Sequence, residues 1–325
     1  MKLYTAVDIA PSPKKIAYND KILLLGSCFA DNIGTKFGEY YFQTTVNPYG
    51  TLYNPASIAK AISGIGNGVS DIGFVEHNGL WHSLSHHGSF SRADKEDLVR
   101  ACEQSRVQLR EALQQASIMI ITFGTAWVYE YEDKVVANCH KLPANRFVRR
   151  RMTVDEIVEI WQPILAAMPD KHWIFTVSPI RHVKDGLHEN QISKAILLQA
   201  VDRLTAKQLD SPIGGLSYFP SYEIMLDELR DYRFYADDML HPSSMAVEYI
   251  WECFCQTYFS KDTLQAMKEW NEIQKALQHK PFRPQSEGYR QFLSQIMLRI
   301  ERMKQKFPYI DAQNELELCH TLLKI

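Results

Sequence analysis

The 325-residue sequence predicts an α/β fold in which helices cover both faces of a central parallel sheet. Two observations support this prediction. Short apolar runs that end in small or turn-forming residues, a pattern typical of buried parallel strands, recur along the chain. Helical patterns separate these runs, as expected where each strand is connected to the next parallel strand through a helix.

The strand pattern occurs in four segments. These are KILLLGS at 21–27, SIMIITFG at 117–124, HWIFTVSP at 172–179 and GLSYFPS at 215–221. A further strand is predicted within YYFQTTVNP at 40–48. Open parallel sheets carry their functional sites at the carboxyl ends of the strands, so candidate residues are sought there.

Helical patterns fill the intervals between the strands. Three long helices are predicted at 93–116, 153–168 and 190–209, and a capping box of Thr153 and Glu156 opens the second. After Asn54, PASIAKAISGIGNG is expected to form a short helix with a glycine-rich end. FVEHNGLWHSLSHHGSF then predicts a loop or a small hairpin.

The C-terminal part of the chain is charged and helical and has no catalytic pattern. DTLQAMKEWNEIQKALQHK and EGYRQFLSQIMLRIERMKQKF predict helices, and KPFRPQ between them interrupts the pattern. The sequence therefore predicts a main domain at 1–260 that carries the site. A helical extension at 261–325 is expected to pack on the core or on a partner.

Composition and charge narrow the functional classes. The chain has 36 Lys and Arg against 38 Asp and Glu, which does not favour an electrostatic nucleic-acid binder. RFVRRR at 146–151 is interpreted as a solvated loop or the start of a helix, with a site for an anionic substrate as the alternative. No membrane span is expected, because no run of about 18 apolar residues occurs. The N-terminal stretch lacks a secretory pattern and the six cysteines lack a regular framework, so free thiols and a cytoplasmic location are expected.

The first predicted strand runs into a turn with two adjacent nucleophilic side chains. Gly26 is followed by Ser27 and Cys28, and FADNIGTKF then begins a helix. A nucleophile at such a turn is served by backbone N–H groups and the helix dipole, which lower the pKa of a thiol. The structural alternative is a tight turn in which Ser27 caps the helix and Cys28 packs in the core.

A second chemical pattern lies in YADDMLHPSS. Asp238 and His241 are three residues apart, so one turn lets the carboxylate orient one imidazole nitrogen and leave the other for a nucleophile. Pro242 follows directly, and the helical run SSMAVEYIWECF then begins. The alternative is that Asp237 and Asp238 cap the turn while His241 packs.

Together the two patterns resemble the SGNH (GDSL-like) hydrolase superfamily. The match is closer to its GSCFA branch, which is named for the pentapeptide at 26–30. NPYGTLYNP, FGTAWVYE, VANCHKLP, VSPIRHVKDG and DDMLHPS also look like that branch, so the resemblance covers about 22–244. It implies an SGNH-like three-layer sandwich with a central parallel sheet, and no cofactor or metal.

The resemblance implies a nucleophile and a base. When the superfamily's Gly-Asp-Ser block is aligned on Gly26 without a gap, Cys28 occupies the position of the nucleophilic serine. Ser27 stays as the alternative, because one inserted residue in the turn would exchange their roles. Asp238 and His241 match the Asp-x-x-His block.

The resemblance also implies an oxyanion hole, in which one donor is missing. Gly50 in NPYG is the candidate for the glycine N–H. The Gly-x-Asn block reads Gly124-Thr125-Ala126, so its asparagine is absent. Loss of one such donor typically costs about 100- to 1,000-fold in rate. The candidate replacements are Thr125, Asn138 and Asn47.

Three histidines in one loop raise the alternative of a metal site. His82, His86 and His87 lie close together in HSLSHHGSF, but no HExxH or cysteine–histidine spacing accompanies them. A loop that contacts the substrate, or one that is merely packed or solvated, is favoured over metal binding.

Two other strand-end segments contain candidate polar residues. Adjacent residues of an extended segment point to opposite sides, so Cys139 and His140 are not expected to pair, but His140 is a candidate polar group near Cys28. Arg181 is predicted either to bind a carboxylate or phosphate of the substrate or to form a structural ion pair with Asp185.

The combined interpretation is acyl-ester chemistry through an acyl-enzyme. The expected reaction is hydrolysis of an acyl ester of a carbohydrate-like or other small hydroxylated molecule, or transfer of an acyl group to such a molecule. A cysteine nucleophile favours transfer, because thioesters exchange well with acceptors. Two other classes stay open: a catalytically degenerate module that binds a glycan or a protein, and a metal-dependent hydrolase.

Overall fold

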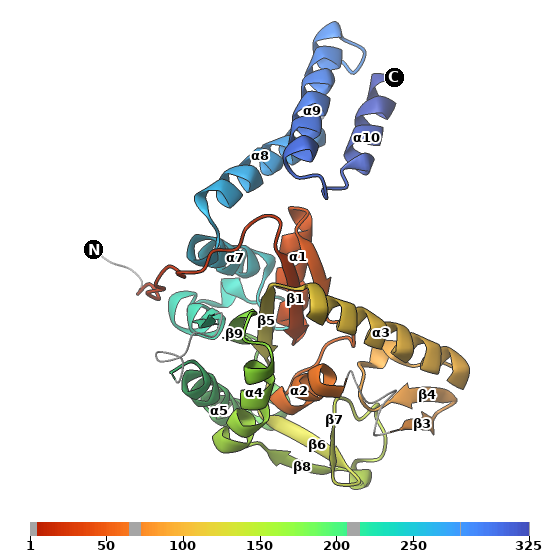
Figure 1. Ribbon diagram of the computed structural model, residues 1–325, viewed down its shortest axis with the longest axis vertical. Coiled ribbons are helices and arrows are strands. Elements are labelled where there is room, and N and C mark those ends of the chain that lie inside the picture. Colours follow the sequence, from red (N-terminus) through yellow and green to blue (C-terminus); the bar gives the residue numbers. More distant parts are fainter. Residues whose placement is uncertain (1–4, 65–72, 207–214, 280, 325) are drawn as a thin grey trace.

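The computed structural model describes residues 5–64, 73–206, 215–279 and 281–324. A five-stranded parallel sheet lies at its centre, in the order β10-β9-β5-β1-β2 (Figure 1). The predicted α/β fold with a central parallel sheet is therefore confirmed. The strands are β1 (Lys21–Gly26), β2 (Gln43–Val46), β5 (Ile118–Phe123), β9 (His172–Val177) and β10 (Leu216–Phe219).

Side chains of the sheet alternate between two buried layers. Ile22 and Leu24 of β1 face the layer that contains α1 (Cys28–Glu39) and α7 (Ser244–Tyr258). Leu23 of the same strand faces the opposite layer. That layer is built by α2 (Pro55–Ser63), α3 (Lys95–Gln115), α4 (Val154–Ala167) and α5 (Leu187–Ala206). Burial on both faces explains why the strands read as continuous apolar runs.

The predicted helices and the hairpin are present. The capping box at the start of α4 forms as expected, with Thr153 and Glu156 bonding each other's backbone N–H groups. The hairpin consists of β3 (Phe74–His77) and β4 (Leu80–Ser83). The predicted glycine-rich end at 65–68 and the last residues of the helix predicted to end at 209 lie outside the described residues.

The interpretation of RFVRRR as a loop or helix start is wrong, because this run contains a strand. β8 (Val148–Arg151) joins β6 (Trp127–Tyr131) and β7 (Lys134–Val136) in a small antiparallel sheet. Cross-strand partners hold the arginines: Arg150 pairs with Glu130, and Arg149 lies over the Trp127 ring at 4.0 Å. Such cross-strand pairs stabilise a strand whose composition alone does not predict one.

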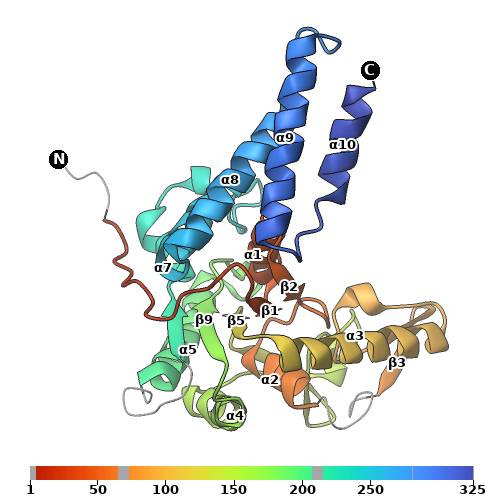
Figure 2. The ribbon, with the colours of Figure 1, turned by 45° about the horizontal axis from the view of Figure 1, so that its top comes forward.

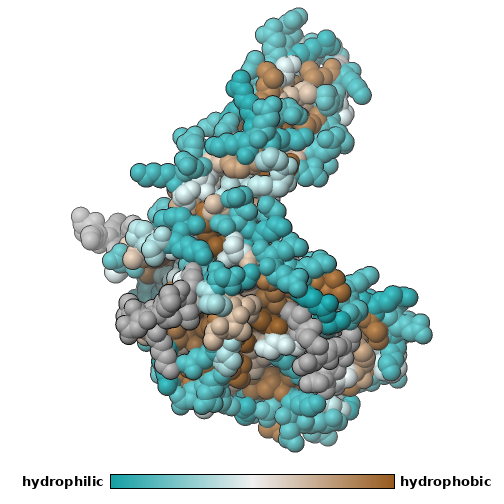
Figure 3. Space-filling view, in the orientation of Figure 1, coloured by the Kyte–Doolittle hydropathy of each residue, from teal (hydrophilic) through white to brown (hydrophobic). Residues whose placement is uncertain are grey.

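Three helices extend from one end of the α/β core: α8 (Lys261–Gln278), α9 (Glu287–Lys306) and α10 (Gln313–Leu323) (Figures 1 and 2). Their base packs on the core, where Trp270 meets Tyr41 edge-on at 4.8 Å and Phe307 stacks on Tyr18 at 4.6 Å. Figure 3 shows hydrophilic side chains over most of this arm. None of the helices in the described ranges has both the length and the apolarity that a membrane span requires.

Several short helical turns complete the chain. They lie at Gly88–Phe90, Ala144–Arg146, Val183–Asp185, Ser221–Glu223, Ile224–Glu228 and Tyr232–Phe234. The third follows β9 and the last three follow β10, so they surround the carboxyl edge of the sheet.

Candidate active site

The carboxyl edge of the sheet opens into a cavity of about 540 Å³, termed here the main cavity. The turn after β1, the loops after β5 and β9, and the loop before α7 contribute to its walls. Both chemical patterns of the sequence therefore meet in one place. The polar and aromatic residues that line it include Ser27, Cys28, Tyr53, Asn54, Thr125, Trp127, Arg149, Arg181, His182 and His241.

The turn after β1 is held rigidly by the neighbouring strand and loops. Gly26 has φ +141°, and a Cβ atom there would lie only 2.1 Å from the carbonyl oxygen of Thr122. Its N–H donates to Asn47 Oδ1 at 2.8 Å, and its carbonyl accepts from the N–H of Leu52 at 2.9 Å. Only glycine fits this position, so the direction in which the chain enters α1 is fixed.

Ser27 and Cys28 have different environments. Ser27 is 1% exposed and is the N-cap of α1, where its Oγ accepts the N–H of Phe29 at 3.3 Å. Cys28 is half-buried and occupies the first position of the helix, on the wall of the main cavity. The capping alternative for Ser27 is therefore confirmed, and the thiol is the more accessible of the two groups.

The expectation of a lowered pKa for the Cys28 thiol is wrong. Burial raises the pKa of Cys28, and the Asp31 carboxylate in the first turn of α1 raises it further. Backbone N–H groups of Cys28 and Phe29 and the charge of Lys194 lower it, but their effect is smaller. A helix N-terminus favours a thiolate only when desolvation and nearby anions do not outweigh it.

Asp238 and His241 form the predicted pair. The Nδ1–H of His241 donates to Asp238 Oδ2 at 2.5 Å, and the backbone N–H groups of Leu240 and His241 donate to Oδ1. These bonds lower the pKa of Asp238 to about 2. Because Nδ1 carries the proton toward the carboxylate, Nε2 of a neutral His241 is left as an acceptor.

A buried lysine joins the ends of two central strands. Lys194 on α5 is 1% exposed, and its Nζ donates to the carbonyl oxygens of Gly124 and Ser178, at 2.7 Å each. Gly124 follows β5 and Ser178 follows β9. Burial lowers the pKa of Lys194 to about 7, and a negative charge on Cys28 opposes this shift. The ammonium group correspondingly favours the thiolate of Cys28.

Another histidine and two arginines also line the main cavity. Nε2 of His182 is buried without a hydrogen-bond partner among the described residues, and burial lowers the pKa of His182 to about 4. Asp185 forms its ion pair with Arg149, so the proposed ion pair with Arg181 is wrong. Arg181 instead donates from Nη1 to the carbonyl of Met239 at 3.3 Å.

The structure brings Thr125 to the main cavity but not two of the other oxyanion candidates. Asn47 and Gly50 line a separate cavity on the other side of α1's first turn, together with Asp31. The Asn47 amide is already used, since Nδ2 donates to Asp31 at 2.7 Å and Oδ1 accepts from Gly26. The Gly50 N–H donates to the Asn47 carbonyl at 2.7 Å. Neither residue is part of the described lining of the main cavity, which contains Cys28.

Asn138 and His140 also lie outside the main-cavity lining. Asn138 Oδ1 accepts the N–H of His140 at 2.9 Å, which closes the turn between them. His140 Nε2–H donates to the carbonyl of Ser83 at 2.7 Å, and its ring stacks on His82 at 4.7 Å. Both residues therefore tie the β7–β8 connection to the hairpin.

Asn54 is a cavity residue that the sequence patterns did not single out. It is the N-cap of α2, and its Oδ1 accepts the N–H of Ser57 at 2.8 Å. This bond fixes the amide, and Nδ2 has no hydrogen-bond partner in the part of the chain that the structure describes. Asn54 thus presents a fixed donor in the cavity that contains Cys28.

The histidine-rich hairpin uses its ring nitrogens for structural bonds. His82 contacts Ser91 Oγ and the carbonyl of His77, and His86 contacts the hydroxyls of Ser83 and Ser105. His87 is the N-cap of a short helical turn. Among the described residues, no group of three histidine, cysteine, aspartate or glutamate side chains is arranged to hold a metal ion.

Comparison with known proteins identifies the chain by family. The model of the GSCFA family matches residues 21–254, and that of the GSCFA domain protein, C-terminal domain, matches residues 270–325. No curated protein and no solved structure matches the chain. The first match includes the turn after β1, the Asp238–His241 pair and the strands between them, and it covers more than half of the chain. The protein therefore belongs to the GSCFA family.

Proposed function

We propose that this protein is an SGNH-type acyl-ester hydrolase or O-acyltransferase that forms an acyl-enzyme on Cys28. One observation carries the proposal: Cys28 at the N-terminus of α1 and His241 oriented by Asp238 line the same cavity. A nucleophile, a base and a group that orients the base are the elements of nucleophilic acyl transfer. The proposed substrate is an acyl ester of a carbohydrate or another small hydroxylated molecule.

In the first step, Nε2 of His241 takes the proton of the Cys28 thiol while the sulfur attacks the ester carbonyl. The raised pKa of Cys28 keeps the thiol protonated at rest, so the base acts during the attack rather than before it. The tetrahedral intermediate then expels the alcohol, which takes the proton from the imidazolium. A thioester on Cys28 and a free hydroxylated product result.

The oxyanion of this intermediate needs fixed donors. Asn54 Nδ2 is proposed as the donor that replaces the missing Gly-x-Asn asparagine, because its amide is oriented by the cap bond to Ser57 and has no other partner among the described residues. The backbone N–H of Cys28, at the first position of α1, is proposed as the second donor.

In the second step, an acceptor attacks the thioester. His241 removes a proton from water or from an acceptor hydroxyl, the C–O bond forms, and the thiolate leaves and is reprotonated. Transfer to a hydroxyl is favoured over hydrolysis, since a thioester retains the energy needed for exchange. The described lining of the proposed cavity has the cations Arg149, Arg181 and Lys184 against the single carboxylate Asp185, which pairs with Arg149, so its net charge is positive and suits an acidic acyl ester.

The test is a comparison of Cys28→Ala, Cys28→Ser and Ser27→Ala on short-chain p-nitrophenyl esters, with and without a sugar acceptor. Cys28→Ala is expected to abolish turnover. Ser27→Ala keeps the nucleophile and loses one helix cap, worth about 1 kcal/mol of stability. Mass spectrometry should find the acyl group on the peptide that contains Cys28.

A binding module without catalysis is the second candidate. Ala126 at the position of the missing asparagine and the raised pKa of Cys28 favour it. Absence of any acyl adduct on Cys28, with wild-type and Cys28→Ala proteins equally inert, would reject the catalytic proposal and favour this candidate.

A further inference from the structure

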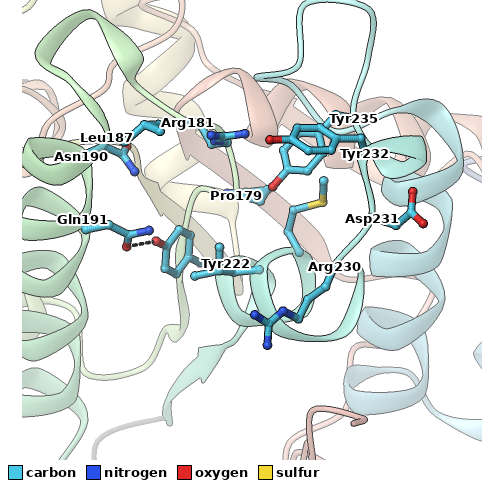
Figure 4. A pocket seen from close by; sticks show the side chains of 12 residues that line it. Pro179, Arg181, Leu187, Asn190, Gln191, Tyr222, Arg230, Asp231, Tyr232 and Tyr235 are labelled. Atoms are coloured by element: carbon cyan, nitrogen blue, oxygen red, sulfur yellow. Dashed lines mark hydrogen bonds between the residues drawn. The ribbon is translucent and has the colours of Figure 1, made fainter. Parts of the chain in front are cut away.

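A second cavity, termed here the side cavity, shares the lining residue Arg181 with the main cavity. Its volume is about 290 Å³, near the lower end for ligand pockets and suited to a single sugar-sized ring. Arg181 lines both cavities and therefore stands at their junction. In Figure 4, Asn190 and Gln191 project from α5, and the rings of Tyr232 and Tyr235 lie next to Arg181.

The two amides on α5 offer donors rather than acceptors. Asn190 is 4% exposed, and its Oδ1 accepts the backbone N–H of His182 at 3.0 Å. Gln191 Oε1 accepts the hydroxyl of Tyr222 at 2.6 Å (Figure 4). With both oxygens occupied, the NH₂ groups remain, and neither has a partner in the described part of the chain.

The charge of the side cavity is also positive. Among the described residues Arg181 forms no ion pair; its guanidinium donates to the carbonyl of Met239 and lies 5.4 Å from the centre of the Tyr235 ring. Arg230, at the far end of the lining, has no carboxylate partner among the described residues. Asp231 is the only carboxylate among the described lining residues, and Arg233 neutralises it by an ion pair at 3.0 Å.

We infer that the side cavity is a subsite for the anionic group of a hydroxylated ligand, a sugar acid or a sugar phosphate. Guanidinium and amide N–H donors match carboxylate and phosphate oxygens. The rings of Tyr232, which is 65% exposed, and Tyr235 provide flat apolar surface for the sugar ring. The inference deepens the proposed function, on which the role of this ligand as acyl donor or acceptor rests.

The binding test uses three probes that share hydroxyl groups and differ in charge: glucuronate, glucose 6-phosphate and glucose. Calorimetry should give at least one of the two anions a Kd ten-fold or more below that of glucose, and added NaCl should weaken it. Whichever anion binds more tightly distinguishes a carboxylate from a phosphate ligand. Equal binding of glucose, or no binding of either anion at 10 mM, would overturn the inference.

The variants test the position of the site. Asn190→Asp keeps the oxygen that accepts the His182 N–H but replaces the NH₂ donor by a carboxylate oxygen. This variant and Arg181→Gln should each raise the Kd of the anion at least ten-fold. Arg203→Gln is the matched control, because Arg203 lies on the same helix and pairs with Asp155 outside the cavity. Wild-type affinity in both Asn190→Asp and Arg181→Gln would refute the assignment.

The same experiment separates this inference from the proposed function. Binding needs no turnover, so Cys28→Ala should bind the anion as the wild-type protein does. Anion binding without an acyl adduct on Cys28 would retain the subsite and reject the esterase. Turnover of neutral and anionic esters at equal kcat/KM, without anion binding, would retain the esterase and reject the subsite.

Discussion

The histidines of the β3–β4 hairpin and the histidine before α7 differ in how their ring nitrogens are used. His86 contacts a hydroxyl with each nitrogen and is 3% exposed. In His241, which lines the main cavity, Nδ1 bonds Asp238, and Nε2 has no hydrogen-bond partner among the described residues. A similar contrast separates Asn47, whose Oδ1 and Nδ2 both have partners, from Asn54, whose Nδ2 has none among the described residues. A spare polar atom in a cavity, rather than a local abundance of polar residues, therefore marks the candidate site.

The largest expected effect on ester turnover comes from replacing each of the two histidines by alanine. His241→Ala removes the proposed base and should lower ester turnover by about 100- to 10,000-fold. His86→Ala removes one hydrogen-bond partner from each of the buried Ser83 and Ser105 hydroxyls, which costs stability, yet turnover of the folded protein should stay within about three-fold. The measurements are kcat/KM and a urea titration of both variants. Loss of turnover in folded His86→Ala would assign chemistry to the hairpin.

The two asparagines give the next largest effect. Asn54→Asp keeps the helix cap and removes the donor, so turnover should fall about 100- to 1,000-fold with little loss of stability. Asn47→Asp places a second carboxylate beside Asp31 and should destabilise the turn, with a smaller change in kcat. Unchanged kcat in Asn54→Asp would exclude its amide as an oxyanion donor.

The comparison also predicts how stability depends on pH. Burial lowers the pKa of His86 to about 4, below its ordinary value of 6.5, so the unfolded chain binds more protons between these values. The stabilisation from neutral His86 is complete above pH 6.5 and is lost as the pH falls toward 4. It amounts to about 2 to 3 kcal/mol. The free energy of unfolding, measured in urea, should decrease less between pH 7 and pH 4.5 in His86→Phe than in the wild-type protein. An equal decrease in both proteins would contradict this prediction.

The smallest expected effect is on the rate at which Cys28 reacts, and it compares two buried lysines, Lys194 and Lys171. Lys194→Met removes the ammonium group that favours the Cys28 thiolate, so iodoacetamide should label Cys28 about three- to ten-fold more slowly at pH 6.5. Since Lys194 loses its proton near pH 7, the difference should disappear by pH 9. Lys171→Met is the control. Lys171 directly precedes β9, at the end of the strand opposite the main cavity, and its Nζ donates to the carbonyl of Gln114. Equal labelling of wild type and Lys194→Met at pH 6.5 would remove Lys194 from the site.

The sequence predicted the elements whose burial is continuous and the two segments that meet at the sheet edge. Apolar runs revealed the strands, and the parallel topology then brought Cys28 and His241 to one cavity. β8 was missed because its arginines are stabilised by partners on another strand. Lys194 was missed because its partners are backbone carbonyls, which no pattern of side chains reveals.

The signal for Asn54 was present but incomplete. Its place before a proline-led helix predicts an N-cap, and capping accounts for only one of its two polar atoms. Which cavity the second atom faces depends on how α2 packs against the sheet, and local sequence does not contain that information. The same limitation explains why Gly50 and Asn47, which the family resemblance suggested as oxyanion donors near Cys28, line a different cavity.

The wide separation of Cys28 from His241 along the chain also has a consequence during synthesis. About 210 residues must be added after Cys28 before the histidine is made. At roughly 5–20 residues per second, this takes about 10 to 40 seconds. During that interval the growing polypeptide on the ribosome carries the Cys28 thiol without His241, so the proposed acyl chemistry cannot begin before residue 241 has been translated.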